Sequence, residues 1–364
     1  MPATPQRPLA RSLLAALTAV ALSAGMAAAA HAAAPQLVVY DNDFYGPAAT
    51  DVLPLIADPN VKVLGFTVVT GDGWCDEEAN YLLRFLEIAG RGDIPVVKGA
   101  VFPLVNTEAR TRIWEQAHGK LVWKGAWNAA APDNNFHPTD PYLIPPNPAG
   151  TPTLKVTPGM AATFLIEQVH RYPHQVTVIA AGPMTNIALA IRLDPQFSSL
   201  AKQLVFMGAI LDVNLPQVTG NTDFNTDFNF MFDPEAAHIV LTAPWAKITA
   251  VGNVSNDIVM NQALADRIHA KKTPVTDLIA ANVDGLPLWD QLATAIAVDP
   301  TLVTHAVEAR MDVEIDQGAY YGSARLWPET TTPHLGEQKV EFVTAVDGER
   351  FVRGLVAAAQ FQAK

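Results

Sequence analysis

Short apolar runs alternate along the chain with longer segments in which apolar residues recur every three or four positions. The runs at residues 37–40 and 61–69 are rich in β-branched residues, which is typical of strands buried on both faces. After the second run, apolar residues at helical spacing continue as far as Gly90, a common helix stop, and predict an amphipathic helix. Strand, helix and strand in this rhythm indicate βαβ units, and therefore a mostly parallel central sheet flanked by helices.

The same rhythm continues towards the end of the chain. Further strands are predicted at residues 94–97, 176–181, 204–208 and 246–251, with short ones in the C-terminal part such as 313–315. Helices are predicted at residues 52–57, 161–169, 187–191, 292–298 and 351–359, and one begins at Pro234 with Asp233 as its N-cap. We find no internal repeat and no clear linker, so the sequence predicts one Rossmann-like α/β domain over residues 35–364.

Residues 102–158 interrupt this rhythm and are dense in proline and tryptophan, as at Trp123 and Trp127. A loop of this length inside a compact domain is usually a lid or a binding loop, or is partly disordered. His118 and His137 lie within it, and we interpret both as solvated surface residues rather than catalytic groups.

The N-terminus has the pattern of a secretory signal peptide. Arg7 and Arg11 give a basic start, residues 13–26 form an apolar run, and the small residues Ala30 and Ala32 fit a cleavage site. The apolar run is too short and wrongly flanked for a transmembrane helix, and no later stretch is long enough to span a bilayer. We therefore expect residues 1–34 to be removed and the mature protein to be exported to the periplasm or the extracellular space without a membrane anchor.

Charge and cysteine content narrow the classes of partner. The 364 residues carry a net charge of −12, which argues against a nucleic-acid backbone as partner. Cys75 is the one cysteine, so an intramolecular disulfide is excluded and a zinc site cannot rest on it. We expect Cys75 to be a small buried residue rather than a catalytic thiol.

Carboxylates gather directly after the first predicted strand, at Asp41, Asp43 and Asp51. Ligands of open parallel sheets bind at the carboxyl ends of strands, and carboxylates crowded there repel one another unless a cation or protons neutralise them. An all-oxygen cluster suits a hard cation, Ca²⁺ or Mg²⁺, better than zinc. Because Asp and Asn also favour helix caps and turns, a purely structural role remains open for this stretch.

Several short motifs, each weak alone, follow one another along the mature chain. They are Asp41 and Asp43 with Thr50-Asp51, then Gly71-Asp72, Gly182–Asn186, Met207-Gly208, Gly220-Asn221, Asp227–Asn229, Asp233–Ala237 and Trp289-Asp290. In this order and at this spacing they resemble the inosine–uridine nucleoside hydrolase family. The resemblance implies a single α/β domain that cleaves the N-glycosidic bond of ribonucleosides to ribose and free base. It also implies a small-molecule nucleoside as partner, and leaves self-association into a homo-oligomer open.

The resemblance also implies roles for individual residues. Asp43 would bind Ca²⁺ and accept a proton from a Ca²⁺-held water, and Asp41 would brace the site from behind. The further metal ligands would be Asp51, Asp290 and the main-chain carbonyl of Thr185. The substrate would be contacted by Asp72, Met207, Asn221, Asp227, Asn229 and Trp289. These residue types suit the reaction, because carboxylates near the sugar stabilise the positive charge of an oxocarbenium-like centre.

The sequence departs from the family pattern at several of these positions. Three additional residues separate Asp43 from Asp51, and Thr50 stands where the family has aspartate. Asp72 replaces asparagine, Asp227 replaces glutamate, and Trp289 stands where some members carry a histidine. An indole cannot usefully protonate a leaving base but can stack on one. Together with Trp74 and the tryptophan-rich lid, Trp289 leads us to expect a preference for purine nucleosides.

Other interpretations remain open at this point. A strand followed by Asp41-x-Asp43 also occurs in phosphatases in which an aspartate is the nucleophile, although no suitable lysine-bearing continuation supports that here. An exported nucleoside- or sugar-binding protein without turnover is the alternative from another class. Thr185 and Asp290 could each simply open a helix, and we interpret Asp233 as a structural N-cap.

Overall fold

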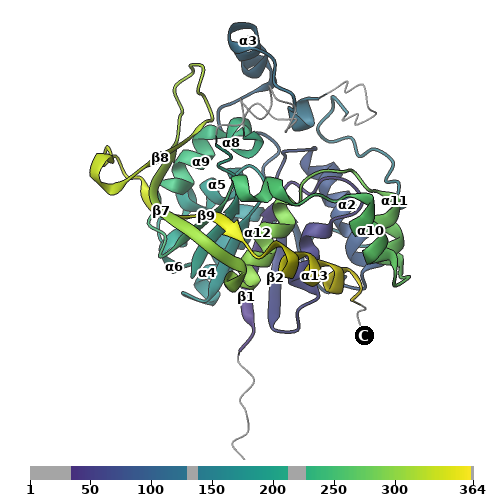
Figure 1. The fold of residues 1–364 in the computed structure, drawn as a ribbon. Coiled ribbons are helices and arrows are strands. Elements are labelled where there is room, and N and C mark those ends of the chain that lie inside the picture. The colour runs from purple at the N-terminus through teal and green to yellow at the C-terminus, as the bar shows by residue number, and fades with distance from the viewer. Residues whose placement is uncertain (1–33, 129–137, 212–226, 362–364) are drawn as a thin grey trace, which may run out of the picture. The chain divides into compact units, whose positions relative to one another are not determined.

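A nine-stranded sheet forms the centre of the structure (Figure 1). The computed structural model describes residues 34–128, 138–211 and 227–361, which fall almost entirely within one compact unit beginning at Pro35. The strands are β1 (Gln36–Asn42), β2 (Val61–Val68), β3 (Val96–Lys98), β4 (Val176–Ala180), β5 (Gln203–Met207), β6 (Ile248–Val251), β7 (Val303–Val313), β8 (Ala324–Trp327) and β9 (Gln338–Val346). Their order in the sheet is β3-β2-β1-β4-β5-β6-β9-β7-β8.

The sheet is mostly parallel, as the sequence predicts. Every neighbouring pair from β3 to β9 is parallel, whereas β7 pairs antiparallel with both β9 and β8. The prediction of a short strand at 313–315 is wrong, because the strand there is β7 and ends at Val313. Much of β7 is exposed and does not alternate regularly between buried and exposed residues, so its sequence lacks the periodicity that marks a strand.

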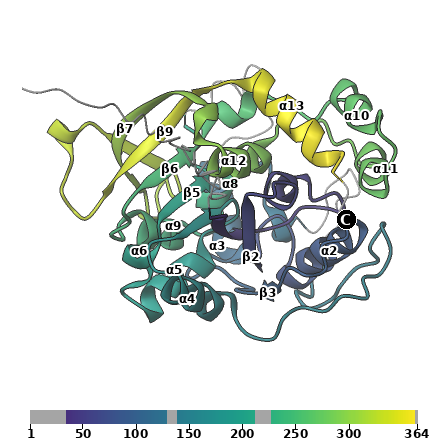
Figure 2. The same ribbon diagram turned by 90° about the horizontal axis from the view of Figure 1, so that it is seen from below.

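Helices cover both faces of the sheet (Figure 2). The α-helices are α1 (Leu53–Ile56), α2 (Cys75–Ile88), α3 (Glu108–His118), α4 (Ala161–Arg171), α5 (Thr185–Leu193), α6 (Phe197–Leu200), α8 (Phe228–Phe232), α9 (Pro234–Leu241), α10 (Gln262–His269), α11 (Pro274–Ala281), α12 (Trp289–Val298) and α13 (Gly348–Ala359). Short 3-10 helices are η1 (Thr50–Val52), η2 (Gly125–Trp127), η3 (Asn253–Asp257), η4 (Pro300–Leu302) and η5 (Glu329–Thr331).

Alternate residues of the strands face different helical layers. In β1, Val38 and Tyr40 belong to the hydrophobic cluster that includes α1, α2 and α12, whereas Val39 belongs to the cluster that includes α4, α5 and α9. All three side chains are fully buried. This two-residue period explains why the sequence of β1 is a continuous apolar run, since a strand covered on both faces has no polar side. Cys75 is buried as expected.

Further parts of the chain differ from the sequence predictions. Residues 102–158 are not loop throughout, since they contain α3 and η2. Helix α3 buries only Thr111 and therefore carries little apolar periodicity for sequence analysis to detect. Its N-cap is Thr107, whose hydroxyl accepts a hydrogen bond from the Arg110 main-chain N–H. Helices α10 and α11 are two short helices for which we made no prediction.

The connections place a ligand-binding edge between β1 and β4. From β1 the chain continues through β2 to β3 on one side, and from β4 it continues through β5 to β6 on the other. Adjacent parallel strands whose connections leave in opposite directions form a topological switch point, where a crevice opens at the carboxyl ends. Residues that follow β1 and β4 therefore meet at this edge of the sheet.

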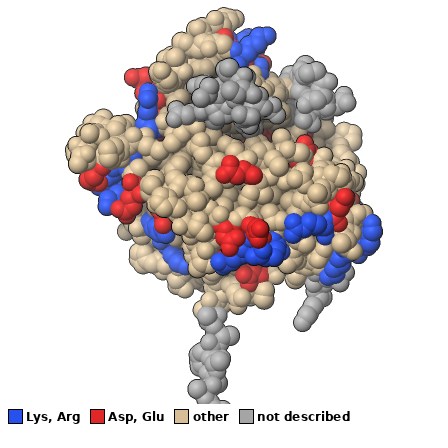
Figure 3. Space-filling view, viewed as in Figure 1, with Lys and Arg blue, Asp and Glu red and all other residues tan. Residues whose placement is uncertain are grey.

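The described residues contain no helix long and apolar enough to cross a membrane. On the face shown in Figure 3, basic and acidic side chains lie beside one another in its lower part. Residues 1–33 lie outside the described part of the chain, so the signal peptide stays a prediction.

Asp233 gives a test of local stability. Its side chain caps α9, as predicted, by accepting from the Ala236 N–H at 3.1 Å, and it also accepts from the Leu104 N–H at 3.0 Å and the Thr185 hydroxyl at 2.6 Å. Asp233→Ala leaves three donors without their acceptor, so we expect a loss of about 2–3 kcal/mol in the free energy of unfolding, measured with urea.

Asp347→Ala is the matched control for this prediction. Asp347 caps α13 by accepting from the Arg350 N–H at 3.0 Å, so its loss should cost about 1 kcal/mol. A loss at Asp233 no larger than that at Asp347 would contradict the structural role.

Candidate active site

Asp43 lies at the carboxyl end of β1, and the backbone of two turns fixes its position. Its Oδ2 accepts a hydrogen bond of 2.8 Å from the Asp72 main-chain N–H, in the turn after β2. A β-carbon on Gly71 would lie 2.0 Å from Asp43 Oδ2, and one on Gly182, after β4, would lie 2.6 Å from Oδ1. Only glycine at both positions allows the two turns to approach this closely, so the carboxylate is clamped at the switch point.

Asp51 and Asp290 come together although 239 positions separate them in the sequence. The amide nitrogen of Asn42 lies 3.2 Å from Asp51 Oδ2 and 3.2 Å from Asp290 Oδ2, so one amide group bridges the two carboxylates. Asp51 belongs to η1 and Asp290 to the first turn of α12. The Thr294 hydroxyl donates to the Asp51 carbonyl at 2.8 Å and fastens these elements together.

Asp41 points to the opposite helical layer from Asn42, as the two-residue period of β1 requires. Its Oδ2 accepts from the Thr67 hydroxyl at 2.5 Å and from the Asn186 amide at 2.8 Å. Thr67 is its register partner on β2, and Asn186 lies in the first turn of α5. Asp41 therefore joins β1, β2 and α5 directly behind the crevice.

Burial shifts the titration of these carboxyl groups upwards. It raises the pKa of Asp43 well above its usual value, and the charges of Asp72 and Asp290 raise it further. Burial raises the pKa of Asp51 to about 6 and that of Asp41 to about 7. The pKa of Asp290 is also raised well above normal, first by burial and then by the charge of Asp51. In each case water is removed from a group that prefers to be hydrated when charged.

Side-chain cations do not neutralise Asp43, Asp51 or Asp290 within the described part of the chain. The ion pairs found there involve other carboxylates. His170, for example, pairs with Asp194. Clustered carboxylates of this kind need protons or an external cation for stability.

The oxygen donors at this point are of the type that a hard divalent cation prefers, but the side chains that carry them are not close enough together to form a metal site. Asp43, Asp51 and Asp290 offer only oxygen donors, and Asn42 Oδ1 is buried without a hydrogen-bond partner. However, no three His, Cys, Asp or Glu side chains among the described residues converge closely enough to form a preformed metal cage. The Asn42 amide donors occupy the space between Asp51 and Asp290 and satisfy their negative charge in part.

Two further predicted site residues have their side chains engaged with the protein. Thr185 opens α5 after β4, and its hydroxyl donates to Asp233. Asp227 is the N-cap of α8, where Oδ1 accepts from the Phe230 N–H at 2.9 Å and Oδ2 from the Ile210 N–H at 3.0 Å. The carbonyl role of Thr185 and the ribose contact of Asp227 stay predictions.

Asn229 and Met207 are in direct contact. The Asn229 amide donates to the Ala181 carbonyl at 2.5 Å and lies 3.3 Å from the Met207 sulfur. Asn229 therefore bridges the carboxyl ends of β4 and β5, beside Gly182. Asn221 lies outside the described residues, so its substrate contact stays a prediction.

Trp289 begins α12 beside Asp290. Its indole N–H donates to Asn256 Oδ1 at 2.7 Å, which fixes the orientation of the ring. The ring is partly buried against the cluster that includes α1 and α12. It lies next in sequence to Asp290, and its contact with a base stays a prediction.

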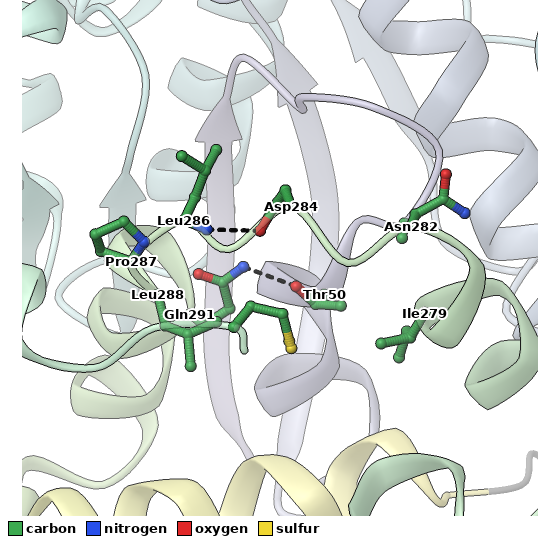
Figure 4. Close-up of a pocket in the computed structure, with 10 residues that line it drawn as sticks. Thr50, Ile279, Asn282, Asp284, Leu286, Pro287, Leu288 and Gln291 are labelled. Atoms are coloured by element: carbon green, nitrogen blue, oxygen red, sulfur yellow. Dashed lines mark hydrogen bonds between the residues drawn. The ribbon is translucent and has the colours of Figure 1, made fainter. Parts of the chain in front are cut away.

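Thr50 lies at a small cavity rather than in the open crevice. Gln291 Nε2 donates to the Thr50 hydroxyl at 2.7 Å, and the cavity between them and Asn282, Asp284 and Leu286 measures about 30 Å³ (Figure 4). Ligand pockets for molecules of nucleoside size are about ten times larger. This cavity is therefore not the nucleoside site.

Sequence analysis missed three residues that the structure places beside the carboxylates. Asn42 stood inside the acidic motif, and its position between two aspartates was the available signal. Glu78 lies in the first turn of α2, is almost fully buried, and has a raised pKa because of burial and the charges of Asp43 and Asp72. Trp123 donates its indole N–H to Asp72 Oδ1 at 2.6 Å, and nothing in the sequence indicated that pairing.

Comparisons with known proteins agree with this architecture. The chain is 32% identical over 282 residues to a probable uridine nucleosidase 2 of Arabidopsis thaliana, covering 74% of this chain and 79% of that protein. It is 29% identical over 361 residues to an uncharacterised protein of Schizosaccharomyces pombe, covering 92% and 88%. Among solved structures, a plant nucleoside hydrolase matches with a TM-score of 0.70 at 23% identity, covering 90% of this chain and 99% of that one.

An inosine–guanosine nucleoside hydrolase structure matches with a TM-score of 0.69 at 21% identity, covering 90% of this chain and all of that one. At such identities the two structural matches show the fold. The family model described as inosine–uridine preferring nucleoside hydrolase matches residues 38–353, which include every described site residue above. The chain therefore belongs to the inosine–uridine preferring nucleoside hydrolase family.

Proposed function

We propose that this protein hydrolyses the N-glycosidic bond of ribonucleosides with Asp43 as the base that accepts a proton from the attacking water. Family membership makes the chain a nucleoside hydrolase and leaves the phosphatase interpretation without support. The observation that carries the proposal is the position of Asp43, clamped between Gly71 and Gly182 at the switch between β1 and β4. A base held by backbone on two sides can act without losing orientational freedom in each turnover.

The proposed reaction forms a C1′–O bond, breaks the C1′–N bond and transfers protons from the water and to the base. The water oxygen bonds to C1′ of the ribose while its proton passes to Asp43. The electron pair of the C1′–N bond leaves with the base, which takes up a proton from solvent, and Asp43 later returns its proton to solvent. Asp51 and Asp290 place negative charge near the sugar, where it stabilises the oxocarbenium-like centre.

Ca²⁺ is part of the proposal because of the donor chemistry of this group. Asp43, Asp51, Asp290 and the Thr185 carbonyl would hold it, with Asn42 rearranging between the carboxylates. When bound, such an ion favours loss of a proton from water and can hold two ribose hydroxyls. The protein contributes the ionised carboxylates. Because burial raises their pKa values, a nearby positive charge would favour their ionised forms.

A preference for purine nucleosides is the finer part of the proposal. The relatives are named for different bases, since one is a probable uridine nucleosidase and another an inosine–guanosine hydrolase. In this chain, aromatic rings lie near the carboxylates: Trp289 precedes Asp290, and Trp123 meets Tyr45 edge-on with ring centroids 5.9 Å apart. A larger base gains more from aromatic surface. We also propose that residues 1–34 act as a signal peptide and direct export of the protein.

Asp43→Asn tests the base directly. The amide has the same shape but cannot accept the water proton, so kcat should fall by roughly 10²–10⁴-fold while KM changes little. Steady-state kinetics on inosine would measure both constants. Asp277→Asn is the matched control, because Asp277 is an exposed residue of α11 that pairs with His269 of α10.

Retention of full activity by Asp43→Asn would contradict the assignment. A wild-type protein that binds nucleosides without releasing ribose would instead identify a binding protein.

Ca²⁺ dependence is tested with chelated protein. Burial raises the pKa values of Asp43, Asp51 and Asp290, so protons and a cation compete for these carboxylates. A cation lowers these values, and Ca²⁺ should therefore release protons on binding, measurable in weakly buffered solution. Saturating Ca²⁺ should also raise the Tm, since a ligand at 100 times its Kd stabilises by about 2.7 kcal/mol.

Asp51→Asn and Asp290→Asn should reduce both the proton release and the Tm response to Ca²⁺. If chelation leaves ribose release unchanged, the reaction does not depend on the cation.

Base preference is tested by comparing kcat/KM for inosine and uridine. Aromatic stacking worth about 1.4 kcal/mol in the transition state corresponds to a tenfold advantage, so we expect inosine to be favoured by roughly tenfold. A preference for uridine would overturn the purine assignment and leave the hydrolase assignment intact.

A further inference from the structure

A segment far from the acidic motif packs against the turn that holds Asp43. We call residues 70–73 the Asp72 turn and residues 119–128 the Trp123 segment. The Ala126 N–H donates to the Gly71 carbonyl at 2.8 Å, and the Trp123 indole N–H donates to Asp72 Oδ1 at 2.6 Å. The Trp123 segment therefore contacts the Asp72 turn through both main chain and side chain.

Close backbone approach makes this docking specific. Gly125 has a φ of +55°, and a β-carbon there would lie 2.1 Å from the Gly71 carbonyl oxygen. On its other side the segment is anchored by Trp127, which stacks on Phe232 of α8 with ring centroids 4.3 Å apart. The Trp123 segment thus fills the space between the Asp72 turn and α8, so Trp123 has a fixed position from which to hold Asp72.

Two hydrogen bonds connect Trp123 to Asp43. The indole donates to the Asp72 carboxylate, and the Asp72 main-chain N–H donates to Asp43 Oδ2 at 2.8 Å. Repulsion between the negative charges of Asp72 and Asp43 would push the turn away from β1. The charge-assisted hydrogen bond from the Trp123 indole opposes this repulsion by holding the Asp72 side chain in place.

We infer that Trp123 is a positioning residue for Asp43, acting through Asp72. Its indole N–H fixes the Asp72 turn, and the turn fixes the carboxylate oxygen that faces it. Trp123 itself need not touch the substrate for this role. The kinetic consequence rests on the proposed function of Asp43 as base, whereas the coupling of the segment to the turn does not.

Trp123→Phe removes the N–H and keeps an aromatic ring. We expect kcat to fall roughly tenfold with KM changed less than threefold, because small displacements of a catalytic group reduce rate strongly. Trp114→Phe is the matched control, since the Trp114 indole donates to the Gly318 carbonyl, outside the site. Its kcat should stay within twofold of wild type.

A double-mutant cycle separates positioning from general packing. If Trp123 acts through Asp72, Trp123→Phe should lower kcat by less than twofold in an Asp72→Ala background. Equal losses in the two backgrounds would overturn the inference, as would a Trp123→Phe enzyme with wild-type kcat while Asp43→Asn is inactive.

Amide hydrogen exchange gives a readout that does not depend on turnover. The peptide that contains Asp72 should exchange at least tenfold faster in Trp123→Phe than in wild type, and at the wild-type rate in Trp114→Phe. Unchanged exchange in Trp123→Phe would refute the coupling. Faster exchange in a protein that hydrolyses no ribonucleoside would sustain the coupling and refute the proposed function.

Discussion

The burial of several carboxyl groups at one edge of a parallel sheet is the constraint on which this structure depends. Asp43, Asp51 and Asp290 lose hydration there, and the charges of neighbouring carboxylates add to the cost of ionisation. A fold tolerates such a group only if protons, hydrogen-bond donors or a cation compensate it. The Asn42 amide and the Asp72 N–H supply donors. They do so incompletely, which is why we propose a divalent ion at this site.

The geometry of β1 directs its adjacent polar residues, Asp41 and Asn42, to different contacts. Asp41 turns towards β2 and α5, Asn42 turns towards η1 and α12, and Asp43 lies beyond the end of the strand between two glycines. A shift of the strand by one residue would exchange these contacts and leave Asp43 without its clamp. The apolar part of β1, buried on both faces, prevents that shift. The seven residues of β1 therefore contribute both to the core and to the site.

The fold and the base preference are determined by different parts of the molecule. Relatives named for uridine and for inosine or guanosine share this architecture or family, so the sheet and its carboxylates do not choose the base. The purine preference that we propose would rest on other elements, Trp289 at the start of α12 and the Trp123 segment among them. The latter also contacts the Asp72 turn, so a change that alters the base site could alter the position of Asp43 as well.

The sequence by itself determined the parallel sheet, the β1 motif and the helices with strong apolar periodicity, because burial on a regular element leaves a regular pattern. It also indicated Asp43, Asp51 and Asp290 as candidate site residues. It did not predict α3 or most of β7, because exposed elements need no apolar face. Nor did it predict that Asn42 bridges Asp51 and Asp290, that glycines 71 and 182 clamp Asp43, or that Trp123 holds Asp72. Those contacts join residues from separate elements, and only the packing of these elements against one another brings such side chains within hydrogen-bonding distance.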